Sequence, residues 1–352
     1  MSKNQNNSSS QIMIALFVCL IFIPLVQSIY NKTDISFPLA IIAAVISTVF
    51  IFLMFIPTIV IGKKTGLDFI SYASKITPNA IIFTAAFYGL YFVYTAVYFL
   101  TNYTDMMIAK VNPDANKYVI ALLVLAACSY GAWKSANALI RCAVFLFAFI
   151  FIALLLIFCG NISNIDFQNA DLQIAGSIPD FIKCVSYLEV GAVVSIIFSC
   201  LSGGTQNFNF RRLIAMLAGY FIVLALSIFF IFFVLSDFGK FQSYQFSILS
   251  KTTQLGNIKE FDSIFLIIST MSAFMLISVI TVCMSKITNC PEQYKINGGF
   301  CLLVFILYLC TENNFAVKQI LLNSNVIMIL TIIGAIIIPC GYLSALRRIK
   351  ND

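Results

Sequence analysis

The sequence predicts an all-α polytopic membrane protein with about ten transmembrane helices. Three observations support this prediction: 61% of the 352 residues are hydrophobic, only 10% are charged, and the mean hydropathy is +0.98. Soluble domains are roughly 45–50% apolar and about 25% charged. The apolar residues are spread along the whole chain, so they do not form a single anchor on a soluble domain. A bilayer accepts this much apolar surface, whereas water does not.

Ten apolar runs are bounded by polar or charged clusters, and each is a candidate for a spanning helix, which needs about 20 predominantly apolar residues. The fourth and ninth runs are short, and we count them because the chain has to cross back between their neighbours. The ten expected spans cover residues 11–29, 37–61, 80–100, 118–131, 142–159, 181–201, 213–235, 263–284, 298–310 and 326–346.

The distribution of charge predicts that both chain ends are cytoplasmic. With the N-terminus inside, the inner segments hold 13 of the 21 Lys and Arg residues but only three of the 14 acids. The outer loops hold the other eight basic residues together with ten acids. Cytoplasmic loops carry an excess of Lys and Arg, and the loss of any one helix would scramble this alternation. The net charge of +7 is therefore explained by membrane orientation and does not indicate nucleic-acid binding.

The expected organisation is a cytoplasmic tail (1–10), a five-helix half (11–160), an extracytoplasmic loop (161–180), a second five-helix half (181–346) and a cytoplasmic tail (347–352). No segment is long enough for a soluble domain. The first run, which follows Lys3, also resembles a cleavable secretion signal, but its long polar lead and the polytopic remainder favour a retained helix. The pattern leaves the helical character of 244–255, in an outer loop, undecided.

Histidine is absent, and this removes the commonest general base and the commonest metal ligand. The eleven cysteines lie almost entirely within apolar runs, and no CxxC pair occurs. Cysteine in such surroundings acts as a small packing residue more often than as a disulfide or zinc ligand. We therefore expect neither a metal site nor a cofactor.

Five plus five helices give the two halves opposite orientations in the membrane, which is the arithmetic of an inverted-topology repeat. In such transporters the substrate site lies where the first helix of each half is interrupted. The first helix has Pro24, which removes a backbone donor and frees a carbonyl one turn earlier, followed by the polar Gln27. The sixth helix contains Glu189 and Gly191 early in its apolar run.

Glu189 is the acid that falls well inside an expected span. An intramembrane carboxylate costs about 2.5–3.5 kcal/mol on insertion scales and tends to be functional. The alternative is that the helix begins later than residue 181 and that Glu189 lies at the membrane interface. A proline such as Pro24 is likewise tolerated in transmembrane helices as a simple kink.

The third expected helix has a polar stripe, with spacings of 4, 3, 4, 3 and 4 residues that place its members on one helical face. A polar stripe within lipid faces either protein or a water-lined cavity, so it indicates a ligand site or an interhelix hydrogen-bonding seam. The eighth helix carries dispersed hydroxyl residues, including Thr270, that fit mainly a packing role. The stripe consists of Thr84, Tyr88, Tyr91, Thr95, Tyr98 and Asn102.

Four stretches resemble the B-subunit family of bacterial spore-germination nutrient receptors, which are related to the amino acid–polyamine–organocation transporters. They are 62–76 with the Tyr-rich helix after it, 135–141, 161–176 before the helix with Glu189, and 255–265. Departures occur within these stretches. The family usually has a glycine and an acid where Ser135 and Asn137 stand, and an arginine where Glu260 stands.

This resemblance implies a receptor subunit in the spore inner membrane that binds a small nutrient, often an amino acid, in a transporter-like central site. It also implies that the protein acts together with two partner subunits to trigger germination. The ligand would lie between the first and sixth helices and face the third and eighth. The expected ligand-binding residues are Pro24, Gln27, Tyr91, Thr95, Glu189, Gly191 and Thr270.

Two other function classes compete with a receptor. An amino-acid permease driven by protons or sodium would use the same fold and site, so the helices do not distinguish the two. A membrane-embedded acyl or glycosyl transferase usually needs paired carboxylates or a histidine. Asp237 and Asp262 lie in an outer loop without a recognisable motif, and the sequence therefore does not indicate an enzyme.

Overall fold

The computed structural model describes residues 9–26, 33–76, 78–110, 113–169, 172–202, 210–240, 242–256, 258–259, 261–288 and 293–349. Within them, nine helices are long and apolar enough to cross a membrane, and a tenth apolar helix is shorter. Their order follows the ten expected runs, and the short one is the fourth. The fold class predicted from the sequence is confirmed.

The first five spans contain most of the expected apolar runs, because hydropathy sets where a helix can lie in lipid. The third helix continues ten residues beyond its expected end, and the fifth begins six residues before its expected start. The loop between the second and third spans holds the short helix α3 (Phe69–Ile76), and the 3₁₀ turn η1 (Ile162–Asn164) follows the fifth span. The five spans are α1 (Ser9–Val26), α2 (Phe37–Thr65), α4 (Pro78–Lys110), α5 (Lys117–Trp133) and α6 (Ala136–Gly160).

The second half contains two spans with π-helical segments and one with a 3₁₀ segment. Its spans are α7 (Ile178–Glu189) with η2 (Val190–Ala192) and α8 (Val193–Leu201), α9 (Phe210–Phe230) with η3 (Ile231–Leu235), α12 (Asp262–Thr288), α13 (Gln293–Asn313), and α15 (Ser324–Ile332) with η4 (Ile333–Ile337) and α16 (Ile338–Ile349). Shorter elements connect them: α10 (Ser236–Lys240), α11 (Gln245–Thr252), the two-stranded hairpin β1 (Gln254–Leu255) and β2 (Ile258–Lys259), and α14 (Phe315–Leu321).

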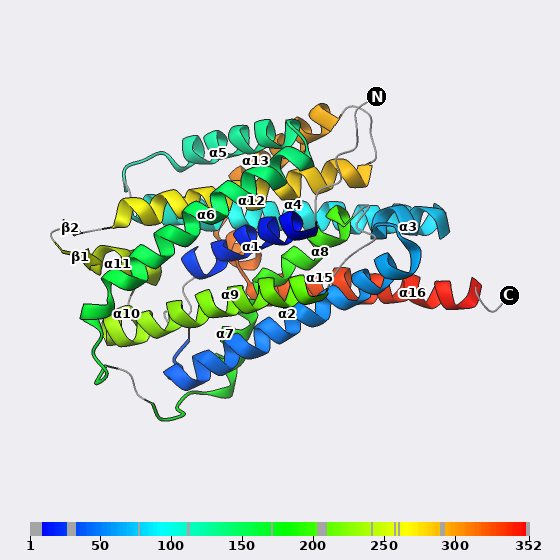
Figure 1. Cartoon of the computed structure of the whole chain (residues 1–352). Helices are drawn as coiled ribbons and strands as arrows, with labels where there is room; N and C mark the ends of the chain where they lie inside the picture. Colours follow the sequence, from blue (N-terminus) through cyan, green and yellow to red (C-terminus); the bar gives the residue numbers. More distant parts are fainter. Residues whose placement is uncertain are drawn as a thin grey trace.

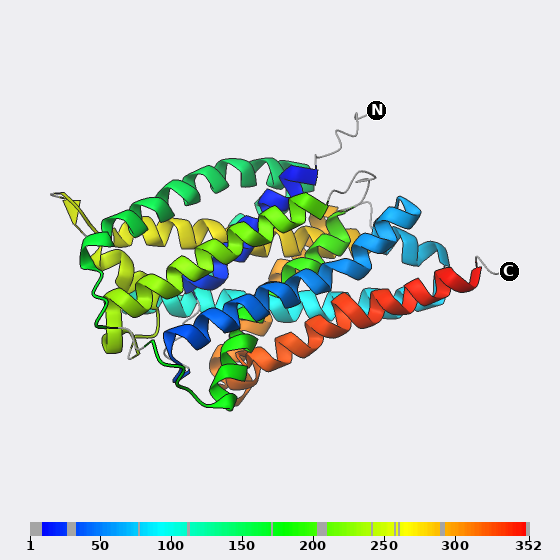
Figure 2. The same cartoon turned by 60° about the horizontal axis from the view of Figure 1, so that its bottom comes forward.

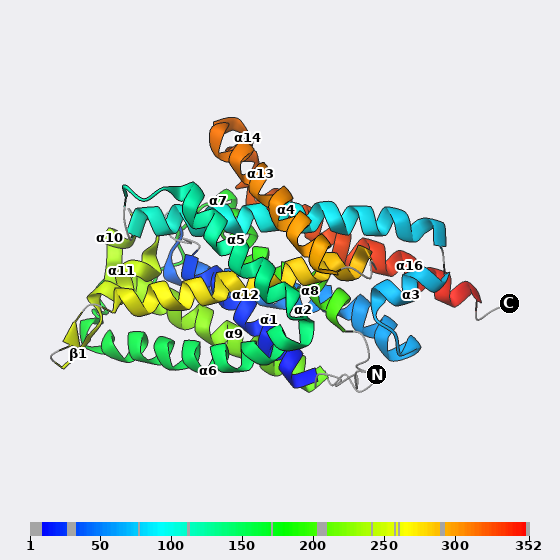
Figure 3. The same ribbon diagram turned by 90° about the horizontal axis from the view of Figure 1, so that it is seen from above.

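The spans form one elongated bundle, and α1 begins at the same end of it at which α16 ends (Figure 1). We call this the terminal end, and the opposite end, with α10, α11 and the hairpin, the loop end. The stretch 244–255, left undecided by the sequence, is largely the helix α11. Seen from above, α14 and the adjoining part of α13 project from the side of the bundle (Figure 3).

Local capping sets several helix ends. The side chains of Asn116, Ser135 and Ser177 accept hydrogen bonds from backbone N–H groups in the first turns of α5, α6 and α7, which satisfies donors that have no partner inside a helix. The helix α2 ends at Gly66, whose φ of +69° lies in the left-handed region that favours glycine.

The centre of the bundle is built from α1 and the broken sixth span. In the most apolar 18-residue stretch of each span, 78% of the residues are buried for α1 and 89% for the sixth span, whereas only 33% are buried for the span that contains α6. A helix that is hydrophobic all round and buried belongs inside a bundle, and one with large exposed apolar side chains faces lipid. The two helices expected to hold the ligand are therefore the most enclosed ones.

Candidate functional site

The sixth span is interrupted directly after Glu189. The α-helix α7 ends at this residue, three residues of 3₁₀-helix follow, and α8 then continues to Leu201. Glu189 is the twelfth of the 24 residues of the span Ile178–Leu201. This position is in the middle of the span and not at its edge, where the alternative interpretation would place it. A 3₁₀ segment within a helix often marks a hinge or a functional site.

Glu189 is a buried carboxyl group whose charge is not matched by an ion pair. The residue is 3% exposed, its Oε2 atom has no hydrogen-bond partner, and none of the ion pairs among the described residues includes it. Burying an ionised carboxylate without a partner is costly, so such a group usually neutralises or meets a ligand or ion. Glu189 therefore has the mid-span position and the unpaired carboxyl group that a ligand site requires.

Gly191 allows three other helices to reach the interruption. A Cβ atom at this position would lie 3.0 Å from Cδ2 of Leu20 in α1, and 3.5 Å from both Cδ1 of Ile51 in α2 and the hydroxyl oxygen of Tyr220 in α9. A larger residue would crowd these three side chains, Leu20 first. The missing side chain at Gly191 therefore brings α1 and α9 against the break in the sixth span.

Pro24 acts on the same region through the backbone of α1. It lies in the last described turn of the helix, which stays helical through Val26. Because proline has no N–H group, the carbonyl of the residue four positions earlier loses its helical donor. That residue is Leu20, whose side chain packs on Gly191. The expected neighbour of Pro24 in the ligand site, Gln27, lies outside the described residues.

The Tyr-rich face of α4 forms a hydrogen-bonding seam with the last span. The Tyr91 hydroxyl bonds the Thr331 hydroxyl at 2.8 Å, and the Tyr88 hydroxyl donates to the Gly334 carbonyl at 2.8 Å. Thr84 bonds the Tyr342 hydroxyl at 3.0 Å. Of the two interpretations of the polar stripe, these three side chains fit the interhelix hydrogen-bonding seam. Tyr91 is buried, and its hydroxyl is bonded to Thr331.

Thr95 lies one turn further along α4 than Tyr91. It is fully buried, and its hydroxyl donates to carbonyls of its own helix. One turn further along α4, the ring of Phe99 meets that of Phe22 in α1 at 5.6 Å, so this face of α4 is turned toward α1.

Thr270, in α12, donates to the Leu266 carbonyl and bonds the Tyr103 hydroxyl at 2.9 Å. Its contacts are with a different turn of α4.

The structure therefore places Leu20, one turn before Pro24, against Gly191, two residues after Glu189. It leaves the hydroxyls of Tyr91, Thr95 and Thr270 bonded within or between helices. It also adds a residue that the sequence did not single out. The Tyr220 hydroxyl is fully buried, lacks a hydrogen-bond partner and lies beside Gly191. A lone tyrosine within the apolar run 213–235 was the available signal.

A second buried carboxylate lies at the loop end and is held by ion pairs. The side chain of Glu312 is 1% exposed and forms ion pairs with Lys117 and with Lys318, the latter at 2.8 Å. Lys318 also pairs with Asp105 at 2.9 Å. Burial alone would lower the pKa of Lys318, but the hydrogen bonds and charges of Glu312 and Asp105 outweigh it and raise that pKa above its usual value. This cluster joins α4, α5, α13 and α14.

No group of three or more Cys, Asp or Glu side chains able to hold a metal ion occurs in the described part of the chain. The residues at the interruption are one carboxyl group, one phenol and a freed carbonyl. This set can accept and donate hydrogen bonds to a small polar molecule and can pair with one positive charge.

Comparison with known proteins agrees with this geometry. The sequence profile of a family described as "Spore germination protein" matches residues 8–319. The chain belongs to the spore germination protein family. A search of curated protein sequences gives no match.

Among solved structures, this member of the family resembles a Na⁺-coupled sialic acid symporter in a substrate-bound, outward-open state. The TM-score is 0.65 at 13% sequence identity, and the match covers 94% of this chain and 79% of the symporter chain. The likeness shows a transporter fold with an inverted repeat. Family and fold together support a role as an integral membrane germinant receptor or transporter, and both belong to permeases and not to enzymes.

Proposed function

We propose that this protein is the membrane subunit of a spore nutrient-germinant receptor, that it binds an amino acid beside Glu189, and that binding triggers germination. In this proposal the protein lies in the spore inner membrane with both termini in the cytoplasm. It acts together with two other receptor subunits. The family match and the transporter fold support the general role.

The observation behind the choice of ligand is the unpaired carboxyl group of Glu189 in the middle of a buried span. A ligand ammonium group would supply the missing positive charge, and a hydrogen bond to a charged group is worth about 1.5–3 kcal/mol. The carbonyl of Leu20 and the hydroxyl of Tyr220 would supply further polar contacts. An amino acid is small enough for a site lined by Gly191 and carries the required ammonium group.

The site is enclosed in this structure, because Leu20, Gly191 and Tyr220 pack directly together. A ligand must therefore separate α1 or α9 from the broken span. Binding can drive a signal only if the ligand prefers one of two arrangements. In our proposal the ligand-bound arrangement is the one that activates the partner subunits.

Ligand binding by the purified full-length protein tests this proposal. The probes are the common L-amino acids and their N-acetyl derivatives, which lack the positive charge. We expect at least one amino acid to bind, its N-acetyl form to bind much more weakly, and Glu189→Gln to lose the difference. The control is Asp166→Asn, which changes an exposed loop carboxylate. Equal binding of the free and N-acetylated forms by the unaltered protein would refute the role of Glu189.

An amino-acid permease driven by protons or sodium is the second candidate, and the fold it shares with a Na⁺-coupled symporter favours it. Uptake of the bound amino acid by proteoliposomes that contain only this protein separates the two. Accumulation driven by an ion gradient would establish the permease. Binding without uptake, together with a germination response that needs the partner subunits, would establish the receptor.

A further inference from the structure

An apolar groove of about 400 Å³ lies where α1, α6 and α9 meet. The helix α1 packs along both α6 and α9, whereas α6 and α9 make few contacts with each other in the described residues. Figure 2 shows α1, in blue, passing between them. The rim of the groove includes Phe151, 49% exposed, and Ile222, 57% exposed, so it opens toward the surface that faces lipid.

The walls of the groove differ in size. On one side the rings of Phe17 and Phe147 meet edge to face at 5.3 Å, and Phe151 stacks against Phe147 at 6.1 Å. On the other side α9 presents the small residues Ala215 and Gly219. A Cβ atom at Gly219 would lie 3.3 Å from the Phe17 ring, so the groove is deep because α9 is small here.

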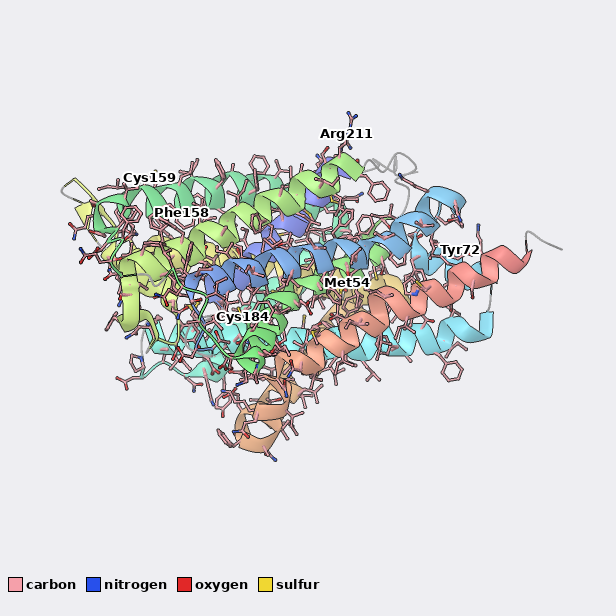
Figure 4. The ribbon with its side chains drawn as sticks, turned by 90° about the horizontal axis from the view of Figure 1, so that it is seen from below. Met54, Tyr72, Phe158, Cys159, Cys184 and Arg211 are labelled. Atoms are coloured by element: carbon pink, nitrogen blue, oxygen red, sulfur yellow. The ribbon has the colours of Figure 1, made fainter. Side chains whose placement is uncertain are left out.

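The groove is apolar along its length and basic at its terminal end. Arg212 lines it there and donates a hydrogen bond to the Ser9 hydroxyl. Arg211 is exposed and points away from the bundle at the start of α9 (Figure 4). Lys63, at the end of α2, lies 4.1 Å from the ring of Phe210. Arg211 and Arg212 immediately precede the apolar run of α9, and Lys63 follows that of α2, positions typical of the membrane–water boundary.

We propose that this groove binds an anionic phospholipid, with its phosphate at Arg212 and one acyl chain between α6 and α9 against α1. Basic pockets between transmembrane helices bind anionic lipid head groups. The planar guanidinium group also matches phosphate geometry. The groove has positive charge at one end and apolar walls along the rest of its length. This combination fits a phospholipid better than a polar partner. The bound chain contacts α1, the helix that packs against Gly191.

Lipid retention by the detergent-purified protein tests this site. Phosphatidylglycerol and phosphatidylcholine are added separately, bound lipid is counted by native mass spectrometry, and the unfolding temperature is recorded. We expect a preference for phosphatidylglycerol and a higher unfolding temperature in its presence, because a ligand of the folded state stabilises it. Arg212→Gln is expected to reduce the preference for phosphatidylglycerol about fivefold, because one cation near an anionic surface contributes about 1 kcal/mol of binding energy. Ala215→Phe, which fills the groove, reduces retention of both lipids.

Two control variants separate the lipid site from a structural effect. Ser9→Ala removes the hydrogen bond of Arg212 but keeps its charge, and Lys295→Gln removes a cation from α13, away from the groove. Both are expected to keep the full preference for phosphatidylglycerol. Equal retention of the two lipids by the unaltered protein overturns the proposal. It is also overturned if Ala215→Phe leaves lipid retention unchanged but releases a membrane protein that copurifies with the unaltered chain, since a protein helix then occupies the groove.

Discussion

Two buried carboxylates, Glu312 and Glu189, have opposite surroundings. Glu312 lies between two lysines, and one of these also holds Asp105, so the cluster contains two positive and two negative charges. Glu189 is nearly as buried but has no ion pair among the described residues. A paired charge supports the fold, because removing one partner leaves the other uncompensated. An unpaired one weakens the fold and is retained where a ligand or ion completes it.

The largest expected effect is on Glu312. In Glu312→Gln, Lys117 and Lys318 lose their shared carboxylate, and we expect a loss of about 3 kcal/mol in unfolding free energy, the low end for a broken buried pair. The low end applies because these lysines are 29% and 22% exposed. The measurement is thermal unfolding in detergent. Lys183→Met, which breaks an exposed pair with Asp180, should leave the transition unchanged; equal shifts for both variants would remove the distinction.

The next effect is on Glu189 and should appear in binding. Glu189→Gln keeps the shape and removes the charge, so we expect the affinity for the amino acid to fall by about 1.5–3 kcal/mol, roughly ten- to a hundredfold. The unfolding temperature should not fall, because a neutral amide is easier to bury than an unpaired carboxylate. Calorimetric titration and thermal unfolding of one preparation measure both. A large loss of stability would place Glu189 in the same class as Glu312.

A smaller effect is expected at the interruption itself. Gly191→Ala places a methyl group 3.0 Å from the Leu20 side chain, and Leu20 must move slightly. We expect a loss of about 1 kcal/mol in stability, the low end for overpacking, because a leucine terminus can shift by a few tenths of an ångström. Ligand affinity should change as well, since the Leu20 side chain shifts beside the proposed site. Gly299→Ala, where the added Cβ meets nothing within 4 Å, is the matched control.

The smallest effect concerns the seam between α4 and the last span. Thr331→Val removes the partner of the Tyr91 hydroxyl while keeping the side-chain volume. Hydrogen bonds between transmembrane helices average about 0.6 kcal/mol, so thermal unfolding should show a shift of that order. Ligand affinity should stay unchanged if Tyr91 only joins helices. A loss of affinity much greater than the loss of stability would assign Tyr91 to the ligand site.

Several features of the fold followed directly from the sequence. The spans and their order came from hydropathy, because each helix has to satisfy its own backbone and cover itself with apolar side chains. The interruption near Glu189 was predicted from the combination of an acid and a glycine within an apolar run. Its form, three residues of 3₁₀-helix, depends on how α1, α2 and α9 press against Gly191, and no local pattern carries that information.

What the sequence alone determined is therefore the membrane class, the number of helices and the presence of a charge in the sixth span. Only the tertiary structure decided which charges are paired. Lys117 and Glu312 are 195 positions apart, and Tyr91 and Thr331 are 240 apart. Hydropathy and periodicity describe the residues within one helix. Ion pairs and hydrogen-bonding seams between helices depend on how whole helices pack, so no local pattern reveals them. That is why two acids of similar burial can differ so completely in their partners.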